Sequence, residues 1–265
     1  MNYTDAHAHL DDITWENLEQ MSLCGIRRII APVHLAAGKA VSCETIREVW
    51  DYLFDVQFGR AKNSGIEPYA MIGISMVSTP REDPAPLYAV LPEYLKRPEV
   101  VAIGEIGIEP ASKTCTDLKQ QEAFVRDQVA LAKQADICVD FHTPFPPEAK
   151  REYTQMMLDI SREIGLPMSK VIIDHCTDAN LGLALDAGAS AAISVQPWRG
   201  VTGETAADLI MAHGFERIMV DSDCSGLPSD PLAVPKTARA LRKKGASEAH
   251  IADVCGMNSQ RIYGL

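Results

Sequence analysis

The chain has 265 residues, of which 46% are hydrophobic and 23% are charged. This balance is typical of a globular protein with a sizeable core, and no apolar run approaches the roughly 18 residues that span a membrane. The net charge of −11 argues against nucleic acid as a partner, because proteins that bind it usually present a basic face. The N-terminus has neither the basic region nor the apolar core of a signal peptide, so we expect a cytoplasmic protein without membrane insertion.

Short β-branched or apolar segments alternate with longer helical patterns along the chain. The predicted strands cover residues 3–9, 27–33, 69–74, 100–106, 137–142, 170–175, 191–195 and 217–222. The predicted helices cover residues 15–24, 44–62, 87–95, 117–135, 147–164, 179–187 and 205–213, and a helical tail follows Asp230. This alternation predicts parallel strands joined by crossover helices. Eight such units favour an α/β fold with one domain over residues 1–265, a TIM (β/α)8 barrel.

An open doubly wound sheet is the alternative fold. That architecture usually carries a Gly-rich phosphate-binding loop after its first strand, and no such loop stands at that position. The stretch from Gly104 to Gly107 is too short for one and carries an acid, Glu105. The barrel is therefore the preferred prediction.

Two histidines, His7 and His9, stand two residues apart in the first predicted strand. Because residues i and i+2 of a strand lie on the same side, both imidazoles should point the same way. A His-x-His pair alone is only moderately specific for metal, since either imidazole could be structural. The pair therefore needs support from residues elsewhere in the chain.

Further possible ligands stand at or just beyond the carboxyl ends of other predicted strands, where the active sites of barrels are built. These residues are Glu105, His142, His175 and Asp223. Each has an ordinary explanation when taken singly, as a turn, cap or loop residue. Together with the histidine pair they predict a metal site of six residues at the mouth of the barrel.

Imidazole and carboxylate ligands suit divalent ions such as Zn, Mn, Mg, Fe or Ni, which this pattern does not distinguish. Two ions are plausible in such a site, and Glu105 is the best placed residue to bridge them. His34, which follows the second strand, and Arg199, which follows the seventh, are candidates for contact with substrate. His213 and His250 lie in helical patterns away from strand ends and are expected to be surface residues.

The motifs resemble those of the TatD-like metal-dependent hydrolases. The matching motifs are Asp5-Ala6-His7-Ala8-His9-Leu10-Asp11, Gly104-Glu105-Ile106-Gly107-Ile108-Glu109, His142, Asp174-His175-Cys176 and Asp221-Ser222-Asp223. The resemblance is closest to a little-characterised branch of predicted TIM-barrel hydrolases that also carries stretches like Val195-Gln196-Pro197 and residues 229–235.

The resemblance implies a binuclear metal centre that activates water to attack an ester-like bond, most plausibly a phosphoester. It implies that His7, His9 and Asp223 bind one ion, that His142 and His175 bind the other, and that Glu105 bridges them. Asp223 would also take a proton from the attacking water, so Asp223 and Glu105 are the catalytic candidates. The implied partner is a small-molecule substrate, and the phosphoester analogy implies that it carries a phosphoryl group.

The sequence departs from the family pattern beside the site. Thr143 and Pro144 follow the histidine of the fifth strand, where the family commonly has a nearby Arg, so DNA cleavage is the implied activity most in doubt.

Two alternatives stay open: hydrolysis of an amide or lactone, as in the wider amidohydrolase group, and a metal-binding accessory protein without turnover. Amidohydrolase barrels often bridge their ions with a carboxylated Lys, and here Glu105 takes that place.

Overall fold

The computed structural model describes residues 1–33 and 41–265 and contains eight parallel strands paired in the order of the sequence. The strands are β1 (Tyr3–Asp5), β2 (Ile26–Pro32), β3 (Glu67–Met71), β4 (Val100–Gly107), β5 (Cys138–His142), β6 (Val171–Ile173), β7 (Ser190–Ser194) and β8 (Ile218–Asp221). The sheet closes on itself, since Ala8 pairs in parallel with Cys224 and the His9 amide donates to the Cys224 carbonyl at 2.9 Å. The predicted (β/α)8 barrel is confirmed, and the strand ends lie within four residues of their predicted positions.

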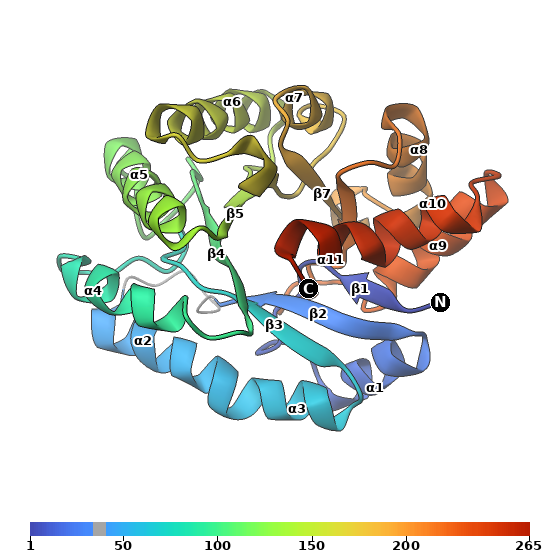
Figure 1. Ribbon diagram of the computed structural model, residues 1–265, viewed down its shortest axis with the longest axis horizontal. Helices are drawn as coiled ribbons and strands as arrows, with labels where there is room; N and C mark the ends of the chain where they lie inside the picture. Colours follow the sequence, from blue (N-terminus) through green and yellow to red (C-terminus); the bar gives the residue numbers. More distant parts are fainter. Residues whose placement is uncertain (34–40) are drawn as a thin grey trace.

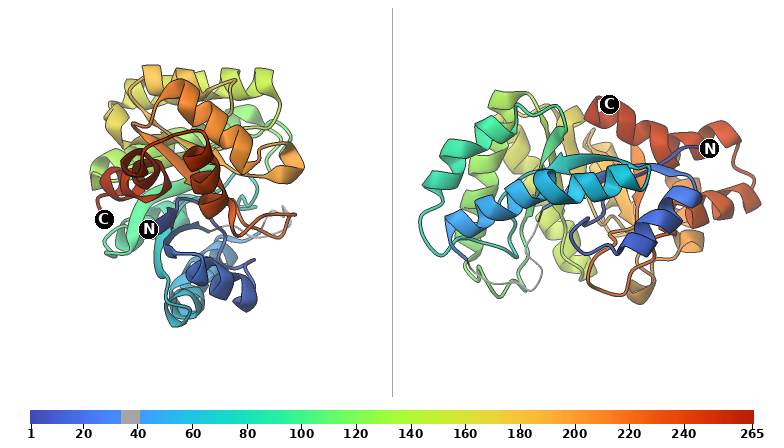
Figure 2. Two further views of the ribbon diagram at one scale, coloured as in Figure 1. Left: turned by 90° about the vertical axis from the view of Figure 1, so that its right-hand side faces the viewer. Right: turned by 90° about the horizontal axis from the view of Figure 1, so that it is seen from below.

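Helices surround the barrel, as Figures 1 and 2 show. They are α1 (Trp15–Leu23), α2 (Cys43–Tyr52), α3 (Phe58–Asn63), α4 (Ala85–Tyr94), α5 (Leu118–Ala135), α6 (Pro147–Ile164), α7 (Leu181–Asp186), α8 (Gly203–His213), α9 (Ala233–Lys243), α10 (Glu248–Ala252) and α11 (Asn258–Tyr263). The helix predicted over residues 44–62 is interrupted by a π-helical turn, η1 (Leu53–Gln57), which joins α2 to α3. Among the described helices, none is long and apolar enough to cross a membrane.

Apolar side chains form two separate clusters. The larger cluster lies between the strands and the surrounding helices, and includes Ile29, Ile103 and Ile173. The smaller cluster takes the alternate residues of the strands, such as Ile30, Ala102 and Ile172, and therefore fills the inside of the barrel. The C-terminal helix α11 contributes Tyr263 to this inner cluster, and α10 and α11 lie in front of the strands in Figure 1.

A layer of buried acids lies between the inner apolar cluster and the mouth of the barrel. It consists of Asp5, Asp140, Asp174 and Asp221, which are at most 1% exposed. The Tyr263 hydroxyl donates to Asp140 Oδ2 at 3.1 Å and so connects the apolar cluster to this layer. Burial raises the pKa of Asp5 to about 6 and raises those of Asp140 and Asp221 well above the usual range. The barrel interior is thus apolar at one end and rich in carboxyl groups toward the other.

Candidate metal centre

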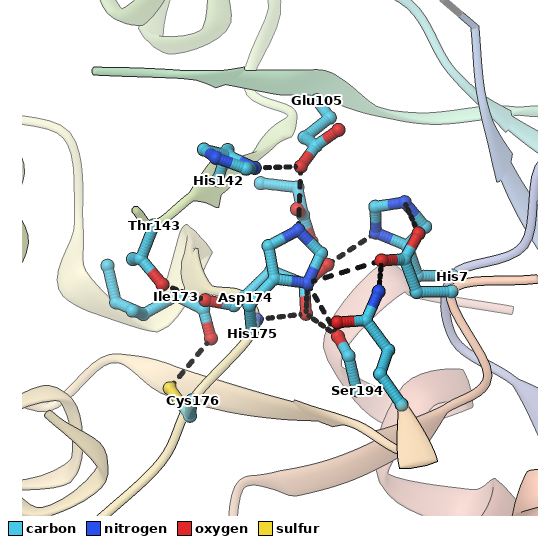
Figure 3. Close-up of polar contacts among 12 residues, drawn as sticks. His7, Glu105, His142, Thr143, Ile173, Asp174, His175, Cys176 and Ser194 are labelled. Carbon is cyan, nitrogen blue, oxygen red and sulfur yellow. Dashed lines mark hydrogen bonds and ion pairs between the residues drawn. The ribbon is translucent and has the colours of Figure 1, made fainter. Parts of the chain in front are cut away.

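Six side chains meet at the carboxyl ends of the strands in two groups of three, each compact enough to hold a metal ion. Figure 3 labels four of them, His7, Glu105, His142 and His175. The first group is His7, His9 and Asp223, and the second is Glu105, His142 and His175. They are the same six residues that the strand ends predict. Their burial is high, because all six lie below the rim of the barrel and only His142 is partly exposed.

The spacing of the first group fits tetrahedral coordination. His7 Nε2 lies 3.1 Å from His9 Nε2, and Asp223 Oδ1 lies 3.2 Å from His9 Nε2 and 3.7 Å from His7 Nε2. Ligand bonds of about 2.0–2.1 Å at tetrahedral angles would place neighbouring donor atoms about 3.4 Å apart. The three donors are therefore already spaced as three corners of a zinc-like coordination shell.

The second group is centred on one oxygen of Glu105. Glu105 Oε1 lies 2.6 Å from His142 Nδ1 and 2.9 Å from His175 Nε2. Two imidazole nitrogens thus face one carboxylate oxygen in a buried site, which suits a shared proton or a shared cation. The donor set is imidazole and carboxylate, as the ions predicted from the sequence require.

An irregularity in β4 places Glu105 inside the barrel. Ile103 pairs with Val139 and Ile106 pairs with Phe141, so β4 advances three residues where β5 advances two. Such a bulge shifts the alternation of inward and outward side chains by one residue. Glu105 therefore points inward, although Ile103, two residues earlier, packs against the helices. Gly104 permits this close approach, because a Cβ there would lie 2.9 Å from the Cβ of Asp140.

Left-handed backbone turns place two of the other candidate ligands. His175 has a φ of 53° and Asp223 a φ of 40°, and only two other non-glycine residues in the described chain have positive φ. Ile173 ends β6 and packs toward the helices, so simple alternation would send His175 outward as well. The left-handed turn instead brings its imidazole to Glu105.

The second nitrogen of three imidazoles has a hydrogen-bond partner of its own. His7 Nδ1 is hydrogen-bonded to Asp174 Oδ2. His175 Nδ1 lies 2.6 Å from Ser194 Oγ, and His142 Nε2 lies 3.3 Å from Glu109 Oε2. In metal sites this outer contact fixes the ring orientation and the tautomer, and an acceptor there raises the basicity of the nitrogen that faces the ion. The arrangement of both ring nitrogens therefore fits metal binding.

Opposite charges stabilise one another in the site. Burial alone would raise the pKa of Glu105, but His142 and His175 hold it well below its usual value. Burial likewise opposes a charge on the imidazoles, yet Asp174 raises the pKa of His7 well above normal and Glu105 raises that of His142 to about 9. The carboxylates and imidazoles of the site thus favour each other's charged forms.

The remaining predicted residues lie elsewhere. Arg199 stands at the rim, in a turn after β7, while His34 falls outside the described residues. His213 and His250 are exposed on helices, as expected.

Four residues that contact the site were not singled out from the sequence as site residues, namely Glu109, Asp174, Ser194 and Gln196. Asp174 and Glu109 stand inside the quoted motifs, so their closeness to ligand residues was the available signal. Gln196 stands inside the quoted Val195-Gln196-Pro197 stretch, which was its signal. For Ser194 the only signal was its position at the end of the seventh strand, which many polar residues share.

Comparison with protein families gives a match over nearly the whole chain. The model of the TatD-related DNase family matches residues 4–264. An uncharacterised metal-dependent hydrolase of Methanocaldococcus jannaschii is 30% identical over 261 residues, which cover 98% of this chain and 99% of the relative.

Solved structures with the same fold come from more than one kind of hydrolase. A TatD-like protein of Archaeoglobus fulgidus has a TM-score of 0.79 at 23% identity and covers 99% of this chain and 100% of its own. A β-aspartyl dipeptidase of Fervidobacterium islandicum has a TM-score of 0.70 at 15% identity and covers 100% of this chain and 75% of its own. At these identities the likeness shows the fold and leaves the bond that is cleaved to be argued from the site.

Proposed function

This chain belongs to the TatD-related family of metal-dependent hydrolases, and on that premise we propose that it binds two divalent ions and hydrolyses a phosphoester. One ion would be held by His7, His9 and Asp223, and the other by His142 and His175. Glu105 would bridge them. The observation that supports this proposal is the meeting of two three-residue donor groups at one mouth, with the donor atoms of each group within 4.8 Å of one another.

Bound ions of this kind lower the pKa of water and polarise a substrate oxygen. The side chains of this protein would orient the metal ligands and accept a proton from the attacking water. Asp174 accepts a hydrogen bond from His7 Nδ1 and leaves Nε2 facing His9. Gln196 donates to Asp223 Oδ2 and fixes that carboxylate, whose other oxygen faces the histidine pair. Asp223 would take the proton that the attacking water loses.

A small substrate fits this site better than a long nucleic acid. The net charge is −11, and the lysines on α9 and just after it already pair with carboxylates of α8 and of the segment before α9. These pairs are Lys236 with Asp230, Lys243 with Glu204 and Lys244 with Asp208. Those pairs leave no free basic stripe along that helix for a phosphate backbone. We therefore propose a small phosphorylated molecule as the substrate.

Removal and return of metal tests the proposal. Protein treated with a chelator should hydrolyse no phosphomonoester or phosphodiester, and reloading with Zn, Mn, Mg, Fe or Ni should restore cleavage of at least one. Dipeptides, lactones and DNA serve as comparison substrates, and metal content is measured alongside. If reloaded protein cleaves only an amide or lactone, the phosphoester part of the proposal is wrong. Less than one equivalent of metal under binding conditions would instead favour an accessory protein without turnover.

A further inference from the structure

Phe145, Trp198 and Arg199 lie together at the rim of the barrel, and we call these three residues the rim clamp. Phe145 lies in the loop between β5 and α6, and the other two belong to the turn η3 (Pro197–Arg199) after β7. The Arg199 guanidinium lies 4.5 Å from the centre of the Trp198 ring and 5.3 Å from that of Phe145. A cation thus stands over two aromatic rings at the end of the barrel where the candidate metal centre lies.

The clamp has the features of a binding surface. Phe145 is 55% exposed and Trp198 is 46% exposed, so neither ring is used to fill the core. Within the described part of the chain, no carboxylate lies within ion-pair distance of Arg199. Stacking on the rings restrains the guanidinium, and a restrained guanidinium without a carboxylate partner is well suited to bind an anion with two parallel hydrogen bonds.

A small pocket connects the clamp to the metal centre. Its described lining includes Phe145, Lys150, His175, Ser194, Gln196 and Arg199, and contains no carboxylate. His175 faces Glu105, and Gln196 donates to Asp223, so the pocket adjoins both donor groups. A group bound in the pocket would therefore lie beside the candidate metal centre.

Lys150 adds a second basic group to the pocket wall, and burial lowers the pKa of its ammonium to about 8. Its side chain is almost completely buried, and Nζ donates to Thr143 Oγ1 at 2.8 Å and to the His175 carbonyl at 2.7 Å. Both acceptors are uncharged, so the ammonium charge is not cancelled by a directly bonded carboxylate. Thr143 stands next to the position where the sequence lacks the expected Arg, and Lys150 and Arg199 bring cations to the same region from other elements.

The pocket itself has a volume of about 20 Å³, enough for about one water molecule, so a larger group must sit at its open mouth. We propose that this mouth and the rim clamp form a substrate subsite for an aromatic phosphoester. The phosphoryl group would bind between Arg199 and the metal centre, and the ring attached to it would stack on Trp198 or Phe145. A planar ring gains stacking on either side chain, whereas an alkyl group does not. This inference rests on the proposed phosphoester function and adds the chemical class of the substrate.

Binding of two phosphonates that cannot be hydrolysed tests the subsite. Metal-loaded protein is titrated with phenylphosphonate and with methylphosphonate in a calorimeter, and the phenyl compound should bind about tenfold more tightly. Arg199→Ala should weaken both compounds roughly 10- to 100-fold, because a charge-assisted hydrogen bond is lost. Trp198→Ala combined with Phe145→Ala should remove the preference for phenyl. It should weaken methylphosphonate less than Arg199→Ala does, because the guanidinium stays in place but loses the rings that restrain it.

Matched controls separate the subsite from general effects. Arg162→Ala removes an arginine whose side chain is 45% exposed near the far end of α6, and Tyr52→Ala removes an aromatic ring that is 50% exposed on α2. Both variants should bind as the unmodified protein does, and all variants should keep its metal content and thermal unfolding midpoint.

Phosphonate binding is measured without turnover, so the subsite and the proposed function can fail separately. The subsite inference is wrong if the unmodified protein shows no preference for phenylphosphonate, or if Arg199→Ala binds both compounds normally. If the preference depends on the clamp but no phosphoester is cleaved, the proposed function fails and the subsite stands. If Arg199→Ala cleaves phosphoesters at the full rate and binds phosphonates normally, the proposed function stands and the subsite fails.

Discussion

Glu105→Ala should eliminate hydrolysis and lower the metal content of the purified protein. Glu105 Oε1 is the only described carboxylate oxygen in the second donor group, where it faces His142 and His175. Metal ions stabilise the transition state of hydrolysis by several kcal/mol, so losing them should reduce kcat/KM at least about 1,000-fold. Activity is measured with the best substrate found by metal reloading, and metal content by elemental analysis.

His7→Ala tests the first donor group in the same way. The matched control is His213→Ala, since His213 is exposed at the end of α8 and should be dispensable for both activity and metal content. Thermal unfolding of each variant shows whether the barrel remains folded. Equal activity in His7→Ala and unmodified protein would end the assignment of the histidine pair as ligands.

Asp174→Asn should weaken metal binding about 10- to 100-fold while all six proposed ligands remain in place. Asp174 Oδ2 is hydrogen-bonded to His7 Nδ1, and Oδ1 accepts from Ser194 Oγ at 3.2 Å. An amide is a weaker acceptor than a carboxylate and can turn its NH2 group toward the imidazole, which would favour the wrong tautomer of His7. Metal affinity is measured by competition with a chelator of known affinity.

Asp178→Asn is the matched control for that substitution. Asp178 lies four residues further along the chain and is exposed, so the same chemical change should leave metal affinity unaltered. If Asp174→Asn binds metal as tightly as the unmodified protein, Asp174 does not position His7. A normal metal affinity combined with a lowered unfolding midpoint would assign Asp174 a structural role only.

The barrel could be predicted from the sequence because its evidence is local. Each strand is a short apolar run followed by a helical pattern, and eight repeats of that alternation leave few folds to choose from. Strand ends also indicated which six side chains meet, since the carboxyl ends of parallel strands share one face. The helix predicted over residues 44–62 lies within one residue of the observed run from Cys43 to Asn63, and only its π-helical turn from Leu53 to Gln57 was not predicted.

Side-chain direction could not be predicted in the same way. Simple alternation from Ile103 and Ile173 would have turned Glu105 and His175 toward the helices, and only a bulge in β4 and a left-handed residue after β6 bring them inward. Neither irregularity leaves a clear mark in the sequence, because both depend on how neighbouring strands pack. The partners Ser194 and Gln196 were missed for a similar reason, since their roles depend on distances across the barrel.

The left-handed conformations of His175 and Asp223 also make metal binding important for the stability of the folded chain. Each such conformation costs about 1–2 kcal/mol for a residue with a side chain, and the cost remains when no ligand is bound. A ligand that binds only the folded state stabilises it by about 2.7 kcal/mol at a concentration 100 times its dissociation constant, enough to offset much of that cost. Under the proposed assignment, a low concentration of free metal would therefore lower the amount of folded protein as well as its activity. The stability of the folded chain would then depend on the metal concentration.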